Sequence, residues 1–143
     1  MDIKKPEGIE YSILNWGPCV MKIKINDNFH AQLLAEAAAS RKPEYLMQDK
    51  LAGIIKEEYK FRNKEVLTPE LAKCIGVYDE AVKRWSNRIP EKPAQYNLRA
   101  LWVNYQGPNE FNPPHDHSDT LSFVIYLDVP EEIHQEQKDY GGK

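Results

Sequence analysis

The order of apolar and polar residues predicts a strand and then a helix in the first part of the chain. Residues 19–25, Cys-Val-Met-Lys-Ile-Lys-Ile, alternate between apolar and charged side chains, which is typical of a half-buried strand. Asp27 and Asn28 are helix-capping residue types, so we expect a helix that runs from there to about Ser40. One face of that helix carries its apolar residues, which are Phe29, Leu33, Leu34 and Ala37.

Two more helices are predicted before residue 93. Helical periodicity favours one from about Pro43 to Phe61, with a stripe formed by Leu46 or Met47, Leu51, Ile54, Ile55 and Tyr59. The other begins at residues 68–70, Thr-Pro-Glu, because threonine caps helices and proline is favoured at the first helical position. Its stripe is Leu71, Cys74, Ile75, Tyr78, Val82 and Trp85, and the prolines at 90 and 93 end it. We interpret all the stripes as faces that pack on a core.

From about residue 95 the pattern changes from helices to strands. Residues 95–106 predict a strand with Tyr96, Leu98, Ala100 and Trp102 on one face and Leu101, Val103 and Tyr105 on the other. A turn-rich segment with two adjacent prolines follows, and a second strand is predicted from Thr120 to Val129. Both faces of this second strand are largely apolar, so we expect it to be buried on two sides. The tail from Glu131 to Lys143 is polar.

Composition narrows the class of protein. The chain has 143 residues, 41% of them hydrophobic, which predicts a single domain over residues 1–143 with its own core. Lys and Arg total 19 against 22 Asp and Glu, so the net charge of −3 gives no electrostatic footprint for duplex nucleic acid.

The sequence also predicts a cytoplasmic protein. No apolar run approaches the ~20 residues of a membrane span, and Met1–Pro6 lacks the apolar core of a signal peptide. Cys19 and Cys74 are far apart in the sequence, and we interpret them as free core thiols, which suits a reducing compartment.

Chemistry is concentrated in residues 115–119, His-Asp-His-Ser-Asp. Two histidines two positions apart on an extended segment point to the same side, so His115 and His117 could share one metal ion at nitrogen distances of about 2.0–2.1 Å. Asp119 lies two residues further along and could add a carboxylate, whereas Asp116 points away. The alternative is a polar turn in which both histidines cap backbone groups.

The surroundings of this segment favour the metal site. Pro113 and Pro114 stiffen the backbone directly before the histidines, which helps to preorganise ligands. Tyr105 and Tyr126 stand on the two flanking strands, where their phenols could hydrogen-bond an anionic co-substrate. The alternative is that both are ordinary strand tyrosines, since tyrosine is favoured in strands.

Two stretches of residues 101–130 are distinctive: Phe-Asn-Pro-Pro-His-Asp-His and Leu-Ser-Phe-Val-Ile-Tyr-Leu-Asp-Val-Pro. With them, residues 101–130 resemble the first half of the catalytic core of Fe(II)/2-oxoglutarate-dependent dioxygenases. The nearest resemblance is to an oxygenase group of bacteria and marine phages with a Pro-His-x-His … Ser-x-x-x-Tyr signature. It implies an α+β fold in which N-terminal helices, about 27–90, pack on part of a double-stranded β-helix (jelly-roll) core with strands at about 95–130.

The resemblance assigns roles to individual residues. His115 takes the position of the first iron ligand, and His117 stands where most members have a carboxylate ligand. Asp119 could supply that carboxylate in a shifted register, so the choice between His117 and Asp119 stays open. Tyr105 and Tyr126 stand where prolyl-hydroxylase-like members have tyrosines that line the 2-oxoglutarate pocket.

The implied activity is hydroxylation by a non-haem Fe(II), 2-oxoglutarate-dependent dioxygenase. The family's distal histidine and co-substrate arginine follow a Gly-Gly turn, where this sequence ends, so we expect an N-terminal portion of the core that is inactive alone. No catalytic residue is assigned beyond the ligands, and the substrate is not indicated. A second copy of the chain is expected to cover the open half of the barrel. If the protein is phage-encoded, the expected cytoplasm is that of the host cell. The alternatives are a non-catalytic oxygenase-like binding or assembly module and a cupin-like metal-binding protein.

Overall fold

A computed structural model gives the fold of residues 10–15, 19–47, 53–86, 95–117 and 119–140. The chain is α+β, as expected, and the described strands form two separate antiparallel ribbons rather than a jelly roll. The elements in chain order are β1 (Glu10–Asn15), β2 (Cys19–Lys24), α1 (Asp27–Ser40), β3 (Glu58–Lys60), α2 (Thr68–Ser86), β4 (Trp102–Asn104) and α3 (Glu131–Tyr140).

Several sequence expectations fall outside these described residues. They concern Met1–Pro6, Leu51 in the second predicted helix, the prolines at 90 and 93 that were expected to end the third, and Gly141–Lys143. Within the part that is described, no helix is both long and apolar enough to cross a membrane.

The first ribbon pairs the predicted strand with a partner that the sequence analysis missed. β2 ends at Lys24, one residue short of the predicted end, and pairs with β1 from Asn15↔Cys19 to Glu10↔Lys24. The hydroxyl of Tyr78 in α2 donates a hydrogen bond to the Cys19 carbonyl oxygen at 3.1 Å. This hydrogen bond connects the first residue of β2 to α2.

α1 has the predicted length, but its N-cap lies one residue earlier than expected. The side-chain oxygen of Asn26 accepts a hydrogen bond from the Phe29 backbone N–H at 2.8 Å, which is the bond that defines a capping residue. Phe29, Leu33 and Ala37 are buried as expected, whereas Leu34, which was predicted on the same face, is 41% exposed.

The second predicted helix is wrong. The described part of residues 43–61 contains a 3₁₀ turn at Pro43–Tyr45 and then β3, whose Tyr59 forms an antiparallel bridge with Leu46. Gly53 has a φ of +113°, which side chains disfavour, and a Cβ there would lie 2.8 Å from the carbonyl oxygen of Phe111. The helical stripe was misleading because the partner of β3 lies more than forty residues further along the chain.

The third predicted helix is confirmed as α2, and the core forms where it begins. Leu71 is buried as expected, together with Val77 and Ala81, which the predicted stripe omitted, while Trp85 at its far end is exposed. Cys74 is a free, partly buried thiol whose pKa is raised by burial, and Cys19 is also free. The buried core cluster is Phe29, Leu33, Ala37, Phe61, Leu67, Leu71, Leu101 and Val103.

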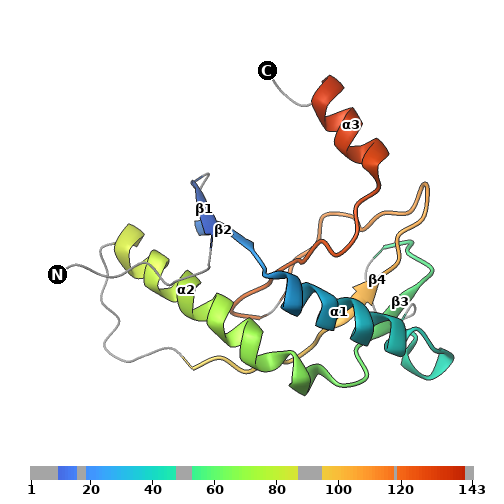
Figure 1. Ribbon diagram of the computed structural model, residues 1–143, viewed down its shortest axis with the longest axis horizontal. Coiled ribbons are helices and arrows are strands. Elements are labelled where there is room, and N and C mark those ends of the chain that lie inside the picture. Colours follow the sequence, from blue (N-terminus) through green and yellow to red (C-terminus); the bar gives the residue numbers. More distant parts are fainter. Residues whose placement is uncertain (1–9, 16–18, 48–52, 87–94, 118, 141–143) are drawn as a thin grey trace.

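The strand predicted over 95–106 is much shorter. Leu101 and Val103 face the core as expected, but Leu98, which was predicted on the opposite face with Trp102, also packs against it. β4 pairs with β3 in the register Glu58↔Asn104, Tyr59↔Val103 and Lys60↔Trp102. Leu101 and Val103 are buried in the core, on the side where α1 crosses the ribbon (Figure 1). Side chains alternate across a strand, so Trp102 lies on the opposite face.

The second predicted strand, 120–129, is not a strand in the structure. Ile125 and Leu127 pack against the core, but Val124 is 78% and Tyr126 80% exposed, so only one side of the segment is buried. His30 of α1 donates a hydrogen bond from Nε2 to the Leu127 carbonyl oxygen at 2.7 Å. A strand buried on two sides needs a neighbour on each face, and the described residues provide only the inner one.

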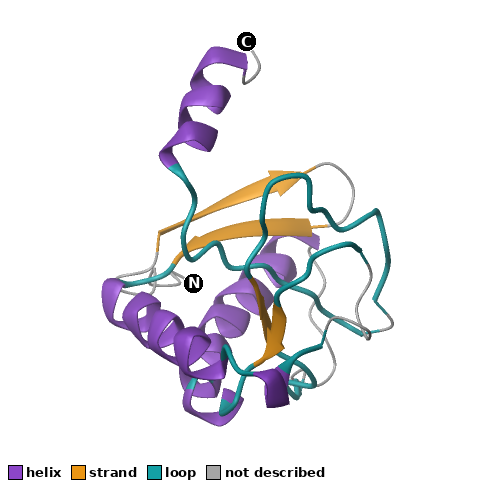
Figure 2. Ribbon diagram, turned by 90° about the vertical axis from the view of Figure 1, so that its right-hand side faces the viewer, coloured by secondary structure: helices purple, strands orange, loops and turns teal. Residues whose placement is uncertain are grey.

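The polar tail contains α3, which the sequence analysis did not predict. The helix projects away from the other elements in two perpendicular views (Figures 1 and 2), and its residues 131–139 are exposed.

The position of the N-cap leads to a test of the fold. Asn26→Ala should lower the free energy of unfolding by about 1 kcal/mol, because the Phe29 N–H loses its partner. Asn28→Ala is the matched control and should change stability by less than about half that amount. Urea unfolding followed by circular dichroism measures both; equal losses in the two variants contradict the assigned cap.

Candidate functional site

The two histidines of the proposed metal site face each other. Their Nε2 atoms are 3.2 Å apart, and their rings meet edge to face with centroids 4.8 Å apart. His115 donates a hydrogen bond from Nδ1 to the Pro113 carbonyl oxygen at 2.8 Å. Both side chains are exposed to solvent.

This geometry suits a shared metal ion. Two nitrogens each about 2.0–2.1 Å from one ion, at about 90–109° to each other, lie roughly 2.9–3.4 Å apart. The bond from Nδ1 to a backbone carbonyl leaves the Nε2 lone pair of His115 free to coordinate, an arrangement that metal-binding histidines commonly use. Without an ion, the 3.2 Å contact is an N–H···N hydrogen bond between the rings.

The alternative reading, in which the histidines cap backbone groups, accounts for only one of these contacts. It describes Nδ1 of His115, which bonds the Pro113 carbonyl oxygen. It does not account for the approach of the two Nε2 atoms, which involves no backbone group.

Asp119 does not join the histidines. Its carboxylate forms an ion pair with Nη1 of Arg99, a residue that sequence reasoning did not assign to the site. Across the described ranges, no three His, Cys, Asp or Glu side chains lie close enough to hold one metal ion. The structure therefore brings together two of the three expected ligands.

The two expected co-substrate tyrosines do not meet the histidines either. Tyr105 packs edge to face on Tyr59, with ring centroids 6.1 Å apart, and burial raises the pKa of its phenol. Tyr126 points largely into solvent. No hydrogen bond or ring contact recorded for the described residues links either tyrosine to His115 or His117.

Tyr105 instead belongs to a cluster with Arg41. The Arg41 guanidinium lies 4.3 Å from the centre of the Tyr105 ring and donates two hydrogen bonds, 2.7 and 2.8 Å long, to the Glu57 carboxylate. These bonds lower the pKa of Glu57 and raise that of Arg41. Because Glu57 engages the guanidinium in a bidentate pair, Arg41 offers little to an incoming carboxylate. No sequence pattern indicated this cluster.

The segment that carries the two histidines, residues 111–117 and 119, is called the histidine loop below. It lies against the outer face of the β3–β4 ribbon. The register places Glu58, Lys60, Trp102 and Asn104 on this face. The rings of Trp102 and His117 have centroids 6.2 Å apart and are tilted by 42°. The alternation at 95–106 placed Trp102 opposite Val103 but gave no sign of its contact with His117.

Glu58 is an unusual member of this face. Its side chain is 2% exposed, and Oε1 has no hydrogen-bond partner among the residues the structure describes. Burial and, secondarily, the nearby Glu110 carboxylate raise its pKa. Both effects disfavour the ionised carboxylate relative to a solvent-exposed glutamate.

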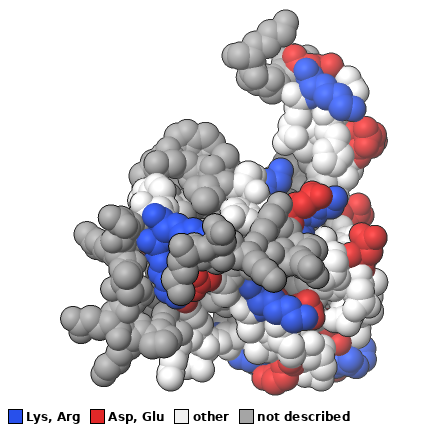
Figure 3. Space-filling model, turned by 60° about the vertical axis from the view of Figure 1, so that its left-hand side comes forward, with Lys and Arg blue, Asp and Glu red and all other residues white. Residues whose placement is uncertain are grey.

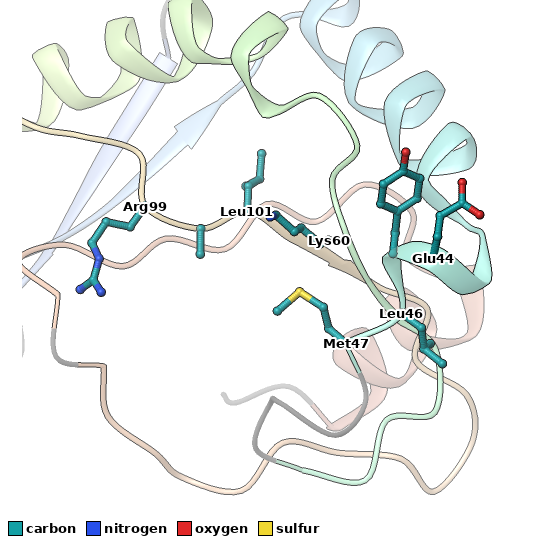
Figure 4. A pocket seen from close by; sticks show the side chains of 8 residues that line it. Glu44, Leu46, Met47, Lys60, Arg99 and Leu101 are labelled. Carbon is teal, nitrogen blue, oxygen red and sulfur yellow. The ribbon is translucent and has the colours of Figure 1, made fainter.

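A cavity of about 420 Å³ lies beside the same ribbon (Figure 4). Its lining residues are Glu44, Tyr45, Leu46, Met47, Lys60, Arg99, Ala100 and Leu101. Met47 and Lys60 point toward the middle of the cavity. Arg99 lies on one side of it and Glu44 on the opposite side (Figure 4). Through Arg99 and its ion pair with Asp119, the cavity adjoins the histidine loop.

Charges of both signs are mixed on the side of the molecule that Figure 3 shows. On the side shown in Figure 3, the described Lys and Arg side chains alternate with Asp and Glu side chains, without a broad area of one sign.

Comparisons with protein-family models, curated proteins and solved structures give no match for this chain.

The raised pKa of Glu58 predicts how stability depends on pH. The pKa of Glu58 in the folded protein lies above that of an unfolded glutamate, which is about 4.3. Its contribution to the free energy of unfolding is therefore present at low pH and is lost as the pH rises through the folded-state pKa. The free energy of unfolding of Glu58→Gln should therefore increase relative to that of the wild type between pH 4 and pH 8. Denaturant unfolding across this range measures the difference.

Glu65→Gln, at an exposed glutamate, is the matched control and should follow the wild type. A stability difference between Glu58→Gln and the wild type that does not change with pH contradicts a raised pKa for Glu58.

Proposed function

We propose that this chain binds a divalent transition metal through Nε2 of His115 and Nε2 of His117, as the imidazole pair of a non-haem Fe(II), 2-oxoglutarate-dependent oxygenase site. The observation that supports this most directly is the 3.2 Å separation of the two Nε2 atoms, with Nδ1 of His115 bonded to a backbone carbonyl. The resemblance of residues 101–130 to the oxygenase core supports iron as the metal.

The chain fits iron in part. Oxygenase iron sites combine two histidines and one carboxylate and leave positions open for oxygen and co-substrate. Here two imidazoles converge, while the Asp119 carboxylate is paired with Arg99. We therefore expect weak binding, with water in the remaining positions. Bound Fe(II) would supply oxidative decarboxylation of 2-oxoglutarate coupled to hydroxylation of a substrate C–H bond.

The chain fits the co-substrate less well. Tyr105 is packed between Tyr59 and Arg41, and Tyr126 is exposed, so neither phenol is placed beside the imidazoles by a described contact. We expect no 2-oxoglutarate turnover by this chain alone. The expected homo-oligomer stays a prediction, for which light scattering after size exclusion is the test.

A second candidate function is a non-catalytic metal-binding module on an oxygenase-like scaffold. The observation that favours it is the lack of a third metal ligand among the described residues. Succinate release from 2-oxoglutarate by the iron-loaded chain would exclude the non-catalytic module, and it would also contradict the inactivity that we expect of the chain alone.

Metal binding by the histidine pair is tested with calorimetric titration of Ni²⁺ or Co²⁺. Either His115→Ala or His117→Ala should reduce affinity by at least about tenfold, because each removes one of two protein ligands and even outer-shell changes cost 10–100-fold. His134→Ala, on the exposed helix α3, is the control and should bind as the wild type does. Wild-type affinity in both single variants contradicts the proposed site.

Asp119→Asn resolves which residue pairs with His115 in the site. Because Arg99 holds the carboxylate of Asp119, this variant should keep metal affinity within about twofold of the wild type. A loss as large as that in His117→Ala would instead identify Asp119 as a ligand.

A further inference from the structure

We infer that Trp102 is a positioning residue for His117, and that its indole holds this imidazole in the orientation from which it can share a metal ion with His115. The inference rests on the proposed metal-binding function and extends it beyond the ligands. It begins from the ring contact between Trp102 and His117, with centroids 6.2 Å apart.

Trp102 is well suited to this role because the backbone that carries it is fixed. Its neighbours Leu101 and Val103 are buried in the core, and the Leu101 carbonyl oxygen accepts a hydrogen bond from the Phe61 N–H at 3.0 Å. Just before β4, Nζ of Lys64 bonds the carbonyl oxygens of Leu98 and Arg99 at 2.7 and 3.0 Å. The indole therefore projects from a rigid strand.

Among the residues that the structure describes, the histidine loop has few other contacts with the rest of the molecule. At one end, the Phe111 carbonyl oxygen accepts a hydrogen bond from the Ile54 N–H at 3.1 Å, and at the other Asp119 pairs with Arg99. Between these anchors, the bond from His115 to Pro113 is local to the loop. Within the described part of the chain, Trp102 is the one recorded ring contact between the histidine pair and a regular element.

The two imidazoles differ in how they are held. A backbone carbonyl fixes the ring of His115 through Nδ1, whereas the recorded contacts of the His117 ring are with His115 and Trp102. Without the indole, His117 could adopt other rotamers in solvent, and metal binding would have to restrict it again. That entropic loss lowers affinity even though both ligands are still present.

The test uses Trp102→Ala, Trp102→Phe and the control Trp85→Ala, which removes an exposed indole from α2. In calorimetric titrations with Ni²⁺, Trp102→Ala should bind about tenfold more weakly than the wild type, the scale of outer-shell partners. Trp102→Phe, which keeps a ring, should stay within about threefold, and Trp85→Ala should match the wild type.

A spectroscopic readout separates positioning from general destabilisation. Co²⁺ at the histidine pair should quench the emission of Trp102, so quenching should persist in Trp85→Ala and largely disappear in Trp102→Phe. If Trp102→Ala does not fold, Trp102→Phe and this quenching still decide. Equal quenching in the wild type and Trp102→Phe would overturn the inference.

The outcomes also distinguish this inference from the proposed function. If the wild type binds neither Ni²⁺ nor Co²⁺, the proposed metal site is wrong and the inference falls with it. If the wild type binds and both histidine variants do not, but a folded Trp102→Ala binds as the wild type does, the metal site stands and the positioning role of Trp102 is wrong.

Discussion

The pairing of β3 with β4 is the constraint on which both the core and the candidate site depend. It brings residues 58–60 against 102–104, and the two faces of the resulting ribbon have different environments. One face places Val103 in the core beside Leu101, where each buried aliphatic side chain contributes roughly 1.5–3 kcal/mol. The other face presents Trp102 to the histidine loop. The burial that stabilises the fold thereby fixes the surface on which the imidazoles meet.

Three carboxylates in and around this part of the fold are paired with arginines. Arg99 holds Asp119, Arg41 holds Glu57, and Arg62 holds Glu36 through hydrogen bonds of 3.1 and 3.2 Å. Of the three expected ligands, the two imidazoles are consequently the ones that stay available. Imidazole nitrogens suit Zn²⁺, Cu²⁺, Ni²⁺ and iron better than they suit Mg²⁺ or Ca²⁺, so the present arrangement favours transition metals.

Local patterns predicted the parts of this structure that local forces determine. The extent of α1 and the start of α2 were predicted because capping residue types and apolar stripes lie in or directly beside the elements, although the cap of α1 is Asn26, one residue earlier than expected. β3 was mistaken for helix because its partner is distant in the sequence. The convergence of His115 and His117 followed from their spacing of two. The pairing of Asp119 could not be foreseen, since Arg99 lies twenty residues away and nothing in the pattern links them.

The most direct test of the account is whether His115 and His117 bind the same metal ion at the same time. Long-range ¹H–¹⁵N spectra of the full chain during titration with Zn²⁺ report each imidazole nitrogen separately. We expect the Nε2 signals of both residues to shift together and to saturate at one equivalent, with Nδ1 of His115 still protonated. A shift of only one histidine, or of neither, would contradict a shared site.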